Sequence, residues 1–290
     1  MTTLIAQTSS LGSLRVPRGA RLQVDRLARE VGEYFDRGAQ VGPCDVVFDV
    51  GANIGAFSVE AARRGGAIEL HAFEPVPPIF DALRSNLEHH DAFSRSRCTA
   101  TRAAVRDEAG ATELSYFLRF PTDSTCDLGT KRRDFNDFFR ARGTEIGRSL
   151  SSSEGAAACL GATFSRISDS AFGRWLADQV TGRVRMSCES RTLSEVLRER
   201  GVERVDLLKV DVEGDETRVL DGIDPSHRRR IGQVVLEAHD HEGRAQHIAE
   251  RLRAMGLTEL HASEPDGARE RGLKSVLFVA SRPEARLHAS

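Results

Sequence analysis

The sequence has few cysteines and no long apolar run. Its five cysteines among 290 residues are scattered and never spaced as C-x-x-C, which argues against a disulfide framework and against a zinc site. No stretch approaches the ~20 apolar residues of a membrane span, and the N-terminus lacks the basic start and apolar stretch of a signal peptide. We therefore expect a soluble, cytoplasmic protein.

The chain also lacks an excess of charge of either sign. Its 41 basic and 43 acidic side chains give a formal net charge of -2. No global field attracts such a chain to nucleic acid or to an anionic membrane, so neither is an expected partner. A small-molecule partner is expected, and nothing in the sequence indicates an oligomer.

Short strands alternate with helices through most of the sequence. Residues 1–44 contain one amphipathic helical stretch, 24–35, which is expected to cover a sheet edge. From residue 45 onward the pattern predicts one α/β domain, 45–290, with a doubly wound, mostly parallel sheet and a ligand crevice at the carboxyl ends of its central strands. The strands are expected at 45–50, 67–73, 97–105, 111–118, 183–189, 205–212, 232–239, 257–262 and 273–281.

Residues 119–183 interrupt this alternation and are interpreted as an inserted helical lid. Two short helices are expected there, at 131–142 and 169–180, on either side of a tract of small residues. Aromatic side chains in the insertion could cap a bulky ligand, or they could pack the insertion onto the core. These aromatic residues are Phe135, Phe138, Phe139, Phe172 and Trp175.

The strongest local motif is a glycine loop, DVGANIG, between the first strand of the domain and the following helix. Gly51 can adopt a positive φ and expose backbone amides to a ligand, while Gly55 allows close packing of helix and strand. Ala52 and Asn53 interrupt the G-x-G-x-x-G pattern of dinucleotide sites, and Asp49 adds a negative charge. The loop therefore fits the zwitterionic and cationic groups of S-adenosylmethionine better than a pyrophosphate.

Glu74 follows the second strand, about 20 residues beyond the glycine loop. A carboxylate at this place can accept hydrogen bonds from both hydroxyls of a ribose. Pro75 ends the strand directly after it. The pair of signals predicts an adenosine site, although Glu74 alone could be a solvated acid at a strand end.

Charged residues alternate along the predicted strand 205–212 and beyond it. A period of two places Lys209, Asp211 and Glu213 on one face, and an ion pair of Lys209 with Glu237 of the next strand is expected. Asp211 and His239 would then flank the crevice at the carboxyl ends of the two strands. Either could act on a substrate hydroxyl, with His239 as a general base. The alternative is that His239 only orients a neighbouring group.

A metal site is the less favoured interpretation of the same cluster. Asp211, His239 and Asp240 could hold a divalent ion, but consecutive residues on a strand point to opposite faces. His239 and Asp240 converge only if the chain has already left the strand. A metal ion is therefore not expected.

The motifs together resemble the FkbM family of methyltransferases. The segments that carry the resemblance are VVFDVGANIG at 46–55, FEP at 73–75, NL at 86–87, AAVRDEAG at 103–110, TLSEVL at 192–197, VDLLKVDVEGDETRVLDGI at 205–223 and VVLEAH at 234–239. The resemblance implies a Rossmann-like class I methyltransferase fold with a seven-stranded sheet, S-adenosylmethionine as donor, and usually O-methylation of a secondary metabolite. The insertion at 119–183 is longer than the family pattern leads us to expect.

The resemblance also assigns residues to the site. It implies that Asp49, Gly51, Asn53 and Gly55 form the donor loop, that Glu74 binds the ribose and that Ala103 lies at the adenine edge. The pocket beyond the sulfonium is assigned to Lys209, Asp211, Glu213, Glu237 and His239. Asp211, Glu213 and His239 are the candidate catalytic residues.

Other functions compatible with the sequence are a metal-dependent O-methyltransferase and an N-methyltransferase. A nicotinamide-dependent oxidoreductase is disfavoured because the loop lacks the middle glycine. A nucleotide-binding protein without turnover is compatible with the donor motifs alone.

Overall fold

The computed structural model describes residues 3–17, 24–118, 124–135, 137, 182–266, 268 and 274–283. Of the predicted lid it therefore describes 124–135, 137 and the end of the insertion, and residues 128–135 are helical there. The helix expected at 169–180 and the aromatic residues Phe138, Phe139, Phe172 and Trp175 lie outside the described residues. Within the described ranges, no helix is both long enough and apolar enough to cross a membrane.

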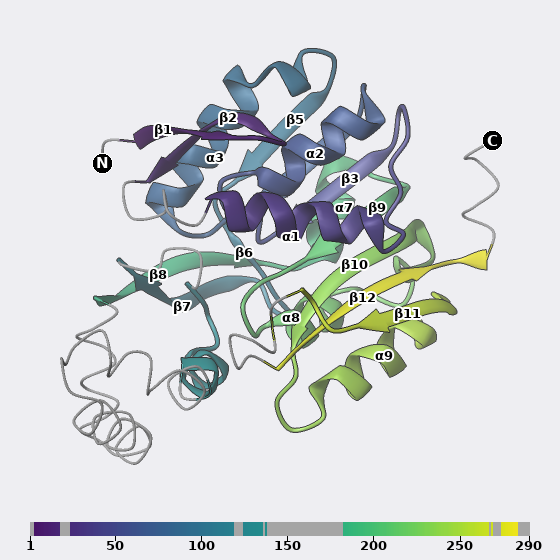
Figure 1. The fold of residues 1–290 in the computed structure, drawn as a ribbon. Helices are drawn as coiled ribbons and strands as arrows, with labels where there is room; N and C mark the ends of the chain where they lie inside the picture. The colour runs from purple at the N-terminus through teal and green to yellow at the C-terminus, as the bar shows by residue number, and fades with distance from the viewer. Residues whose placement is uncertain are drawn as a thin grey trace.

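A seven-stranded sheet forms the centre of the molecule (Figure 1). Its strands lie in the order β11-β12-β10-β9-β3-β4-β5, with β12 antiparallel to both of its neighbours and the other pairs parallel. The strands are β3 (Val46–Val50), β4 (Glu69–Phe73), β5 (Arg97–Thr101), β9 (Val205–Val210), β10 (Ile231–His239), β11 (Glu259–Ser263) and β12 (Ser275–Ser281). The predicted doubly wound, mostly parallel fold is confirmed.

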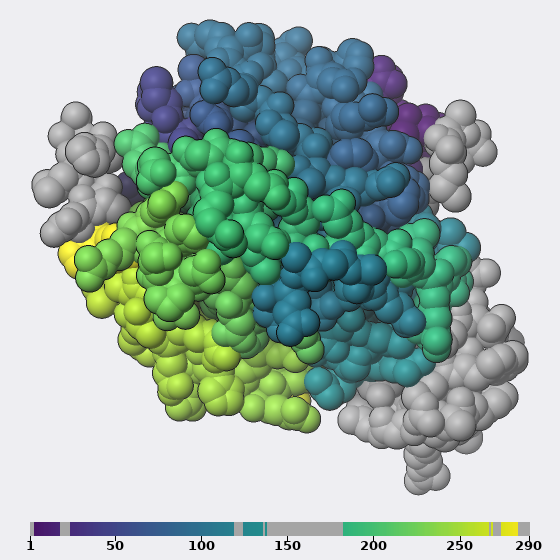
Figure 2. Space-filling model, turned by 180° about the vertical axis from the view of Figure 1, so that it is seen from behind, coloured from purple at the N-terminus to yellow at the C-terminus, as the bar shows by residue number. Residues whose placement is uncertain are grey.

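Helices cover both faces of this sheet. Alternation along β3 sends Val47 to one apolar layer and Phe48 to the other, and both side chains are fully buried. The first layer contains α1 (Val24–Asp36), α2 (Ala56–Gly65) and α3 (Pro77–His89), and the second contains α7 (Leu193–Arg200), α8 (Glu216–Asp221) and α9 (Arg244–Ala254). Figure 2 shows the green and yellow-green outer surface of the second layer. Two short 3-10 helices, Asp91–Phe93 and Arg228–Arg230, complete the connections.

Local sequence signals explain where several helices begin and end. Pro77 and Pro78 occupy the first turn of α3, where a missing amide hydrogen costs nothing. Thr192 and Glu195 form a capping box at the start of α7, and Gly201 ends that helix in the left-handed conformation with φ of 62°. These short-range signals set the helix boundaries.

A second, three-stranded sheet joins the two ends of the insertion. It consists of β6 (Ala104–Val105), β8 (Arg183–Arg191) and β7 (Gly110–Phe117) in that order. The predicted strand 97–105 is therefore divided between two sheets, since β5 belongs to the large one. β7 and β8 pair antiparallel along their whole length, and the Leu118 amide donates to the Gly182 carbonyl at 3.3 Å. The residues before and after the insertion therefore lie side by side at the end of this sheet.

The N-terminal segment contains a hairpin as well as the expected helix. Strands β1 (Thr3–Thr8) and β2 (Gly12–Pro17) pair antiparallel, and α1 occupies the stretch where a helix was predicted. The hairpin is tied to α3 because the buried Asn86 side chain accepts from the Arg15 amide at 2.7 Å and donates to the Arg15 carbonyl at 3.0 Å. The sequence analysis did not predict these two strands.

Candidate active site

The glycine loop connects β3 to α2 in the geometry that its sequence requires. Gly51, Asn53 and Gly55 have φ angles of 76°, 51° and 89°. A Cβ atom on Gly51 would lie 1.8 Å from the Asp211 carbonyl oxygen, so only glycine fits there. The Gly51 and Ala52 amides donate to the Phe73 carbonyl at 3.1 and 2.9 Å, which holds the loop against the end of β4.

Glu74 lies directly beside this loop. Its Oε2 accepts from the Asn53 amide at 3.0 Å, and its Oε1 accepts from the Val76 amide at 2.9 Å. Burial raises the pKa of Glu74 to about 7 despite these two hydrogen bonds. Each carboxylate oxygen retains a second lone pair for a ligand hydroxyl.

A pocket opens above the carboxyl ends of β3, β4 and β9, and we refer to it as the first cavity. Gly51, Asn53, Glu74 and Ala103 line it, whereas Asp49 and Gly55 do not. Its complete lining is Gly51, Asn53, Glu74, Pro75, Ile79, Ala103, Ala104, Val105, Arg106, Leu114, Ser124, Thr125, Cys126, Asp211, Val212, Glu213 and Asp215. Four of the six residues predicted for the donor site thus meet in one cavity.

Asp49 lies below the loop rather than in the cavity. It is fully buried, accepts from the Ser58 hydroxyl at 2.6 Å and lies 3.3 Å from the Lys209 ammonium nitrogen. Lys209 in turn donates to the Gly51 carbonyl at 2.6 Å. Asp49 therefore supports the loop through Lys209.

A second pocket, which we refer to as the second cavity, adjoins the first one. One wall is α1, and the other side carries charged residues from the strand ends and from the helical residues 128–135. Its lining is Arg26, Leu27, Glu30, Val31, Tyr34, Gly51, Ala52, Asn53, Ala56, Phe57, Lys131, Lys209, Asp211, Glu213, Glu237 and His239. Gly51, Asn53, Asp211 and Glu213 line both cavities, so the cavities meet at these residues.

The expected ion pair between Lys209 and Glu237 is wrong. The register of the sheet places Asp49 of β3 opposite Lys209, and Lys209 also lies 3.7 Å from Asp211. Burial opposes the charged form of Lys209, but these two carboxylates raise its pKa. Glu237 instead accepts from the Tyr34 hydroxyl of α1 at 3.2 Å, and burial together with the charge of Asp211 raises the pKa of Glu237 to about 8.

The three candidate catalytic residues all line the second cavity. Asp211 follows β9 directly, and burial raises its pKa. Glu213 lies in the next turn with φ of 57°, and it lies 2.6 Å from the Lys131 ammonium. Although burial opposes ionisation of Glu213, Lys131 and His239 lower its pKa to about 2.

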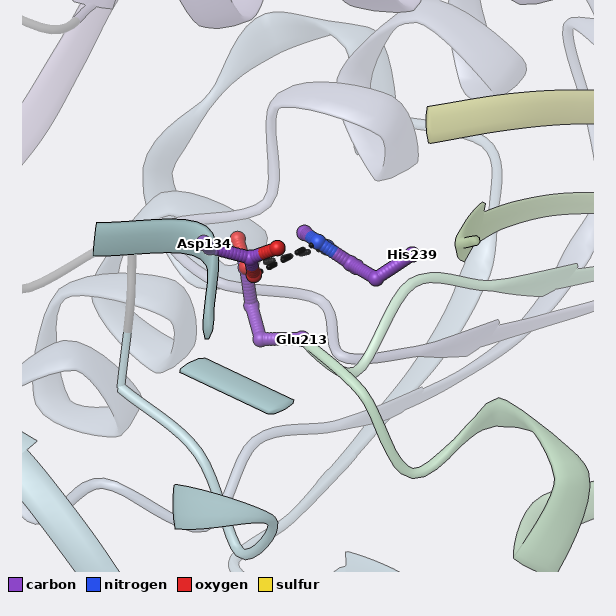
Figure 3. Close-up of side chains that lie close together, drawn as sticks. All are labelled: Asp134, Glu213 and His239. Atoms are coloured by element: carbon purple, nitrogen blue, oxygen red, sulfur yellow. Dashed lines mark ion pairs between the residues drawn. The ribbon is translucent and has the colours of Figure 1, made fainter. Parts of the chain in front are cut away.

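The ring of His239 faces two neighbouring carboxylates, those of Asp134 and Glu213 (Figure 3). Its Nδ1 is 2.8 Å from Asp134 Oδ2, and its Nε2 is 3.1 Å from Glu213 Oε2. Burial opposes the charged form, but these carboxylates raise the pKa of His239 well above its usual range. A charged imidazole carries a proton on each nitrogen and has no lone pair to accept another. This geometry therefore gives no support to the role of general base predicted for His239.

Sequence reasoning missed Asp134, Lys131 and Tyr34 as parts of the site. Asp134 and Lys131 belong to the helical residues 128–135 of the insertion, and Asp134 also accepts from His241 at 2.7 Å. The only signal for them was the predicted helix at 131–142, which does not indicate what its polar residues contact. Tyr34 lies in the predicted amphipathic stretch 24–35, whose pattern does not indicate a polar contact of its hydroxyl.

Asp240 is directed away from the cluster. Its Oδ1 accepts from the Ala245 amide at 2.9 Å in the first turn of α9. The metal set that the sequence suggested, Asp211 with His239 and Asp240, is therefore not brought together.

The strand order, the glycine loop after β3 and the carboxylate after β4 define a class I methyltransferase. The methyltransferase FkbM domain matches residues 49–258, and the chain belongs to this family as an S-adenosylmethionine-dependent methyltransferase.

Two relatives illustrate the similarity. Over 263 residues the chain is 34% identical to the 31-O-demethyl-FK506 methyltransferase FkbM of Streptomyces tacrolimicus. The alignment covers 87% of this chain and 91% of the relative. It is also 34% identical over 205 residues to methyltransferase sdnD of Sordaria araneosa. That alignment covers 68% of this chain and 67% of the relative. Among solved structures, the precorrin-6y C5,15-methyltransferase of Geobacter metallireducens GS-15 aligns with a TM-score of 0.42 at 12% identity, covering 87% of each chain.

Proposed function

We propose that the protein transfers the methyl group of S-adenosylmethionine to a hydroxyl of a small or medium-sized secondary metabolite. The observation that carries this proposal is the meeting of the two cavities at Gly51, Asn53, Asp211 and Glu213. A donor in the first cavity can present its sulfonium at this junction, and an acceptor in the second cavity can approach from the opposite side. In-line attack requires such an arrangement.

The first cavity offers complementary groups to each part of the donor. In this placement the methionine moiety lies along the Gly51 to Asn53 turn, whose amides donate to the Phe73 carbonyl and to Glu74. Glu74 would accept from the ribose hydroxyls with its remaining lone pairs. Ala103 lines the same cavity as the apolar residues Val105 and Leu114, which supports its place at the adenine edge. Asp49 and Gly55 contribute by shaping the loop, since neither lines the cavity.

Asp211 is the best-placed group to receive the proton of the acceptor. It lines both cavities, whereas His239 has both nitrogens against carboxylates. The hydroxyl oxygen forms a bond to the methyl carbon while the carbon–sulfur bond breaks. The electron pair of that bond returns to sulfur, which yields S-adenosylhomocysteine, and the proton passes to Asp211.

The acceptor class is proposed from the second cavity and from a relative. Leu27, Val31 and Phe57 give the cavity apolar surface, while Arg26 and Glu30 supply polar groups from the same helix. Such a lining suits a molecule with an apolar body and several hydroxyls. The Streptomyces tacrolimicus relative is named as a methyltransferase of 31-O-demethyl-FK506, which agrees with an oxygen acceptor.

Product analysis tests the proposal directly. The purified chain is incubated with S-adenosylmethionine and a panel of hydroxylated polyketides, peptides and glycans, and the products are fragmented in a mass spectrometer. A mass gain of one methylene unit on an oxygen supports the proposal. Methylation confined to nitrogen, or donor binding without transfer to any acceptor, contradicts it.

Replacing Glu74 is expected to weaken donor binding. In Glu74→Ala the ribose hydroxyls lose a charged acceptor, which costs about 1–3 kcal/mol of binding free energy for S-adenosylhomocysteine. Isothermal titration measures this loss. Glu69→Ala, at the opposite end of β4 with a side chain 36% exposed, is the matched control and should bind as wild type does. Equal affinities of Glu74→Ala and wild type would remove Glu74 from the donor site.

Donor affinity is also expected to depend on pH near neutrality. Because the pKa of Glu74 is raised to about 7, its carboxylate is ionised above pH 7 and protonated below. The dissociation constant of S-adenosylhomocysteine should therefore increase as the pH falls from 8 to 6, by at most about tenfold per unit below the midpoint. Glu74→Gln, which does not titrate, should lose this dependence, and an unchanged pH profile in that variant refutes the assignment.

A further inference from the structure

Three potential metal ligands from separate elements converge at the edge of the second cavity (Figure 3). Asp134 comes from the helical residues 128–135, Glu213 from the turn after β9, and His239 from the end of β10. One ligand atom of each lies within 4.8 Å of the others. Such a spacing is what a single ion between them requires, because metal–ligand bonds to nitrogen and oxygen are about 2.0–2.6 Å long.

Two buried atoms of this cluster meet in a direct ion pair. His239 Nδ1 and Asp134 Oδ2 are 2.8 Å apart, so two potential ligand atoms already lie side by side. Both residues are almost completely buried, with 4% and 2% exposure. Both ligand atoms are therefore shielded from bulk water, and an ion that binds them replaces the proton that they share.

We propose that Asp134, Glu213 and His239 bind a divalent transition-metal ion. One imidazole nitrogen and two carboxylate oxygens form a donor set suited to Mn²⁺, Fe²⁺ or Zn²⁺, whereas Ca²⁺ and Mg²⁺ favour oxygen alone. Binding of the ion releases the proton from the imidazole nitrogen that becomes its ligand. This set differs from the one that the sequence suggested, since only His239 is common to both.

The ion would act on the acceptor, and this role rests on the proposed function. Glu213 and His239 line the second cavity, and three protein ligands leave coordination positions open toward it. An acceptor hydroxyl that occupies an open position becomes more acidic, so that Asp211 removes its proton more readily.

Lys131 is the group that competes with the ion. Its ammonium nitrogen lies 2.6 Å from Glu213 Oε2 and 4.0 Å from Asp134 Oδ2. Binding of a divalent cation therefore requires this ammonium to withdraw from Glu213, because the two cations repel each other at such distances. Lys131→Met removes the competing charge and should tighten metal binding by about tenfold or more.

The test measures metal binding without donor or acceptor. The full chain is treated with a chelator, dialysed and titrated with MnCl₂ by calorimetry, and the complex is examined by pulsed electron paramagnetic resonance. Wild type should bind one Mn²⁺ with a nitrogen coupling from one imidazole. Asp134→Asn should weaken binding about tenfold or more. The matched control is Asp137→Asn, because Asp137 follows on the same chain segment and pairs with Lys274 at 3.8 Å, and it should bind as wild type does.

Folding of each variant is checked by thermal melting and by S-adenosylhomocysteine binding, and Glu213→Gln replaces Asp134→Asn if the latter does not fold. Absence of Mn²⁺ binding by wild type, absence of the nitrogen coupling, or equal affinity in the folded ligand variant overturns the proposal. Methyl transfer that is fully active in chelator would refute the role of the ion but leave the proposed function intact. Failure of the proposed function appears separately, as donor binding without transfer to any acceptor.

Discussion

Asp211→Asn is expected to lower the rate of methyl transfer by ~10²–10⁴-fold while leaving the affinity for S-adenosylhomocysteine within a few-fold of wild type. The amide keeps the size of the side chain and removes its capacity to accept the proton of the acceptor. Because Asp211 lies at the junction of the two cavities, the loss should fall on turnover rather than on donor binding. Single-turnover kinetics with saturating donor, together with calorimetry, separate the two quantities.

The control for this variant lies on the same strand. Asp206→Asn, near the start of β9, keeps a side-chain oxygen that can accept from the Val46 amide, as Asp206 does at 2.8 Å. We expect it to retain nearly full activity. Comparable turnover of Asp211→Asn and wild type would refute the assignment of Asp211 as proton acceptor. Glu237 would then be the next candidate for this role.

Gly51→Ala is expected to destabilise the fold by about 2–5 kcal/mol and to abolish measurable donor binding. Two costs add up in this range. An added Cβ would overlap the Asp211 carbonyl oxygen at 1.8 Å, and a residue with a side chain is strained at φ of 76°. Relief requires the loop to move away from β9, which disrupts both cavities at their junction. Urea unfolding and calorimetry measure the two effects.

Gly201→Ala isolates the conformational part of this penalty. Gly201 has φ of 62°, and no atom outside its immediate neighbours lies within 4 Å of an added Cβ. This variant should therefore lose only about 1 kcal/mol of stability and bind the donor normally. If Gly51→Ala is no less stable than Gly201→Ala, the close approach of the loop to Asp211 does not restrict the residue type at position 51.

The main features of the fold were predictable because they depend on short-range patterns. Runs such as 46–50 and 205–210 are long enough to identify strands, and the alternation of strands with helices implies their parallel arrangement. The sequence pattern does not show, however, which sheet each strand joins. Residues 97–105 read as one strand, but the chain changes sheets after Thr101, and only the pairing of β6 with β8 reveals it.

The prediction of the site was limited by register and by contacts distant in sequence. Lys209 and Glu237 share a predicted face, but the register sets Lys209 opposite Asp49 on one side and Val235 on the other. Alternation alone cannot supply this offset between strands. Asp134 reaches His239 across more than a hundred residues of sequence, and a helical pattern in the insertion does not indicate such a contact.

Because α1 borders only the second cavity, donor binding and acceptor binding would depend on different parts of the sequence. The first cavity is bounded by strand ends and the loops between them. Substitutions there would weaken binding of the donor that we propose for this cavity. Residues 24–36 form one wall of the second cavity alone and lie outside the matched family domain, 49–258. Under the proposed function, divergence in this one helix would alter the choice of acceptor and leave the donor site unchanged. Exchanging the helix between relatives is then expected to transfer substrate preference without changes to the residues of the first cavity.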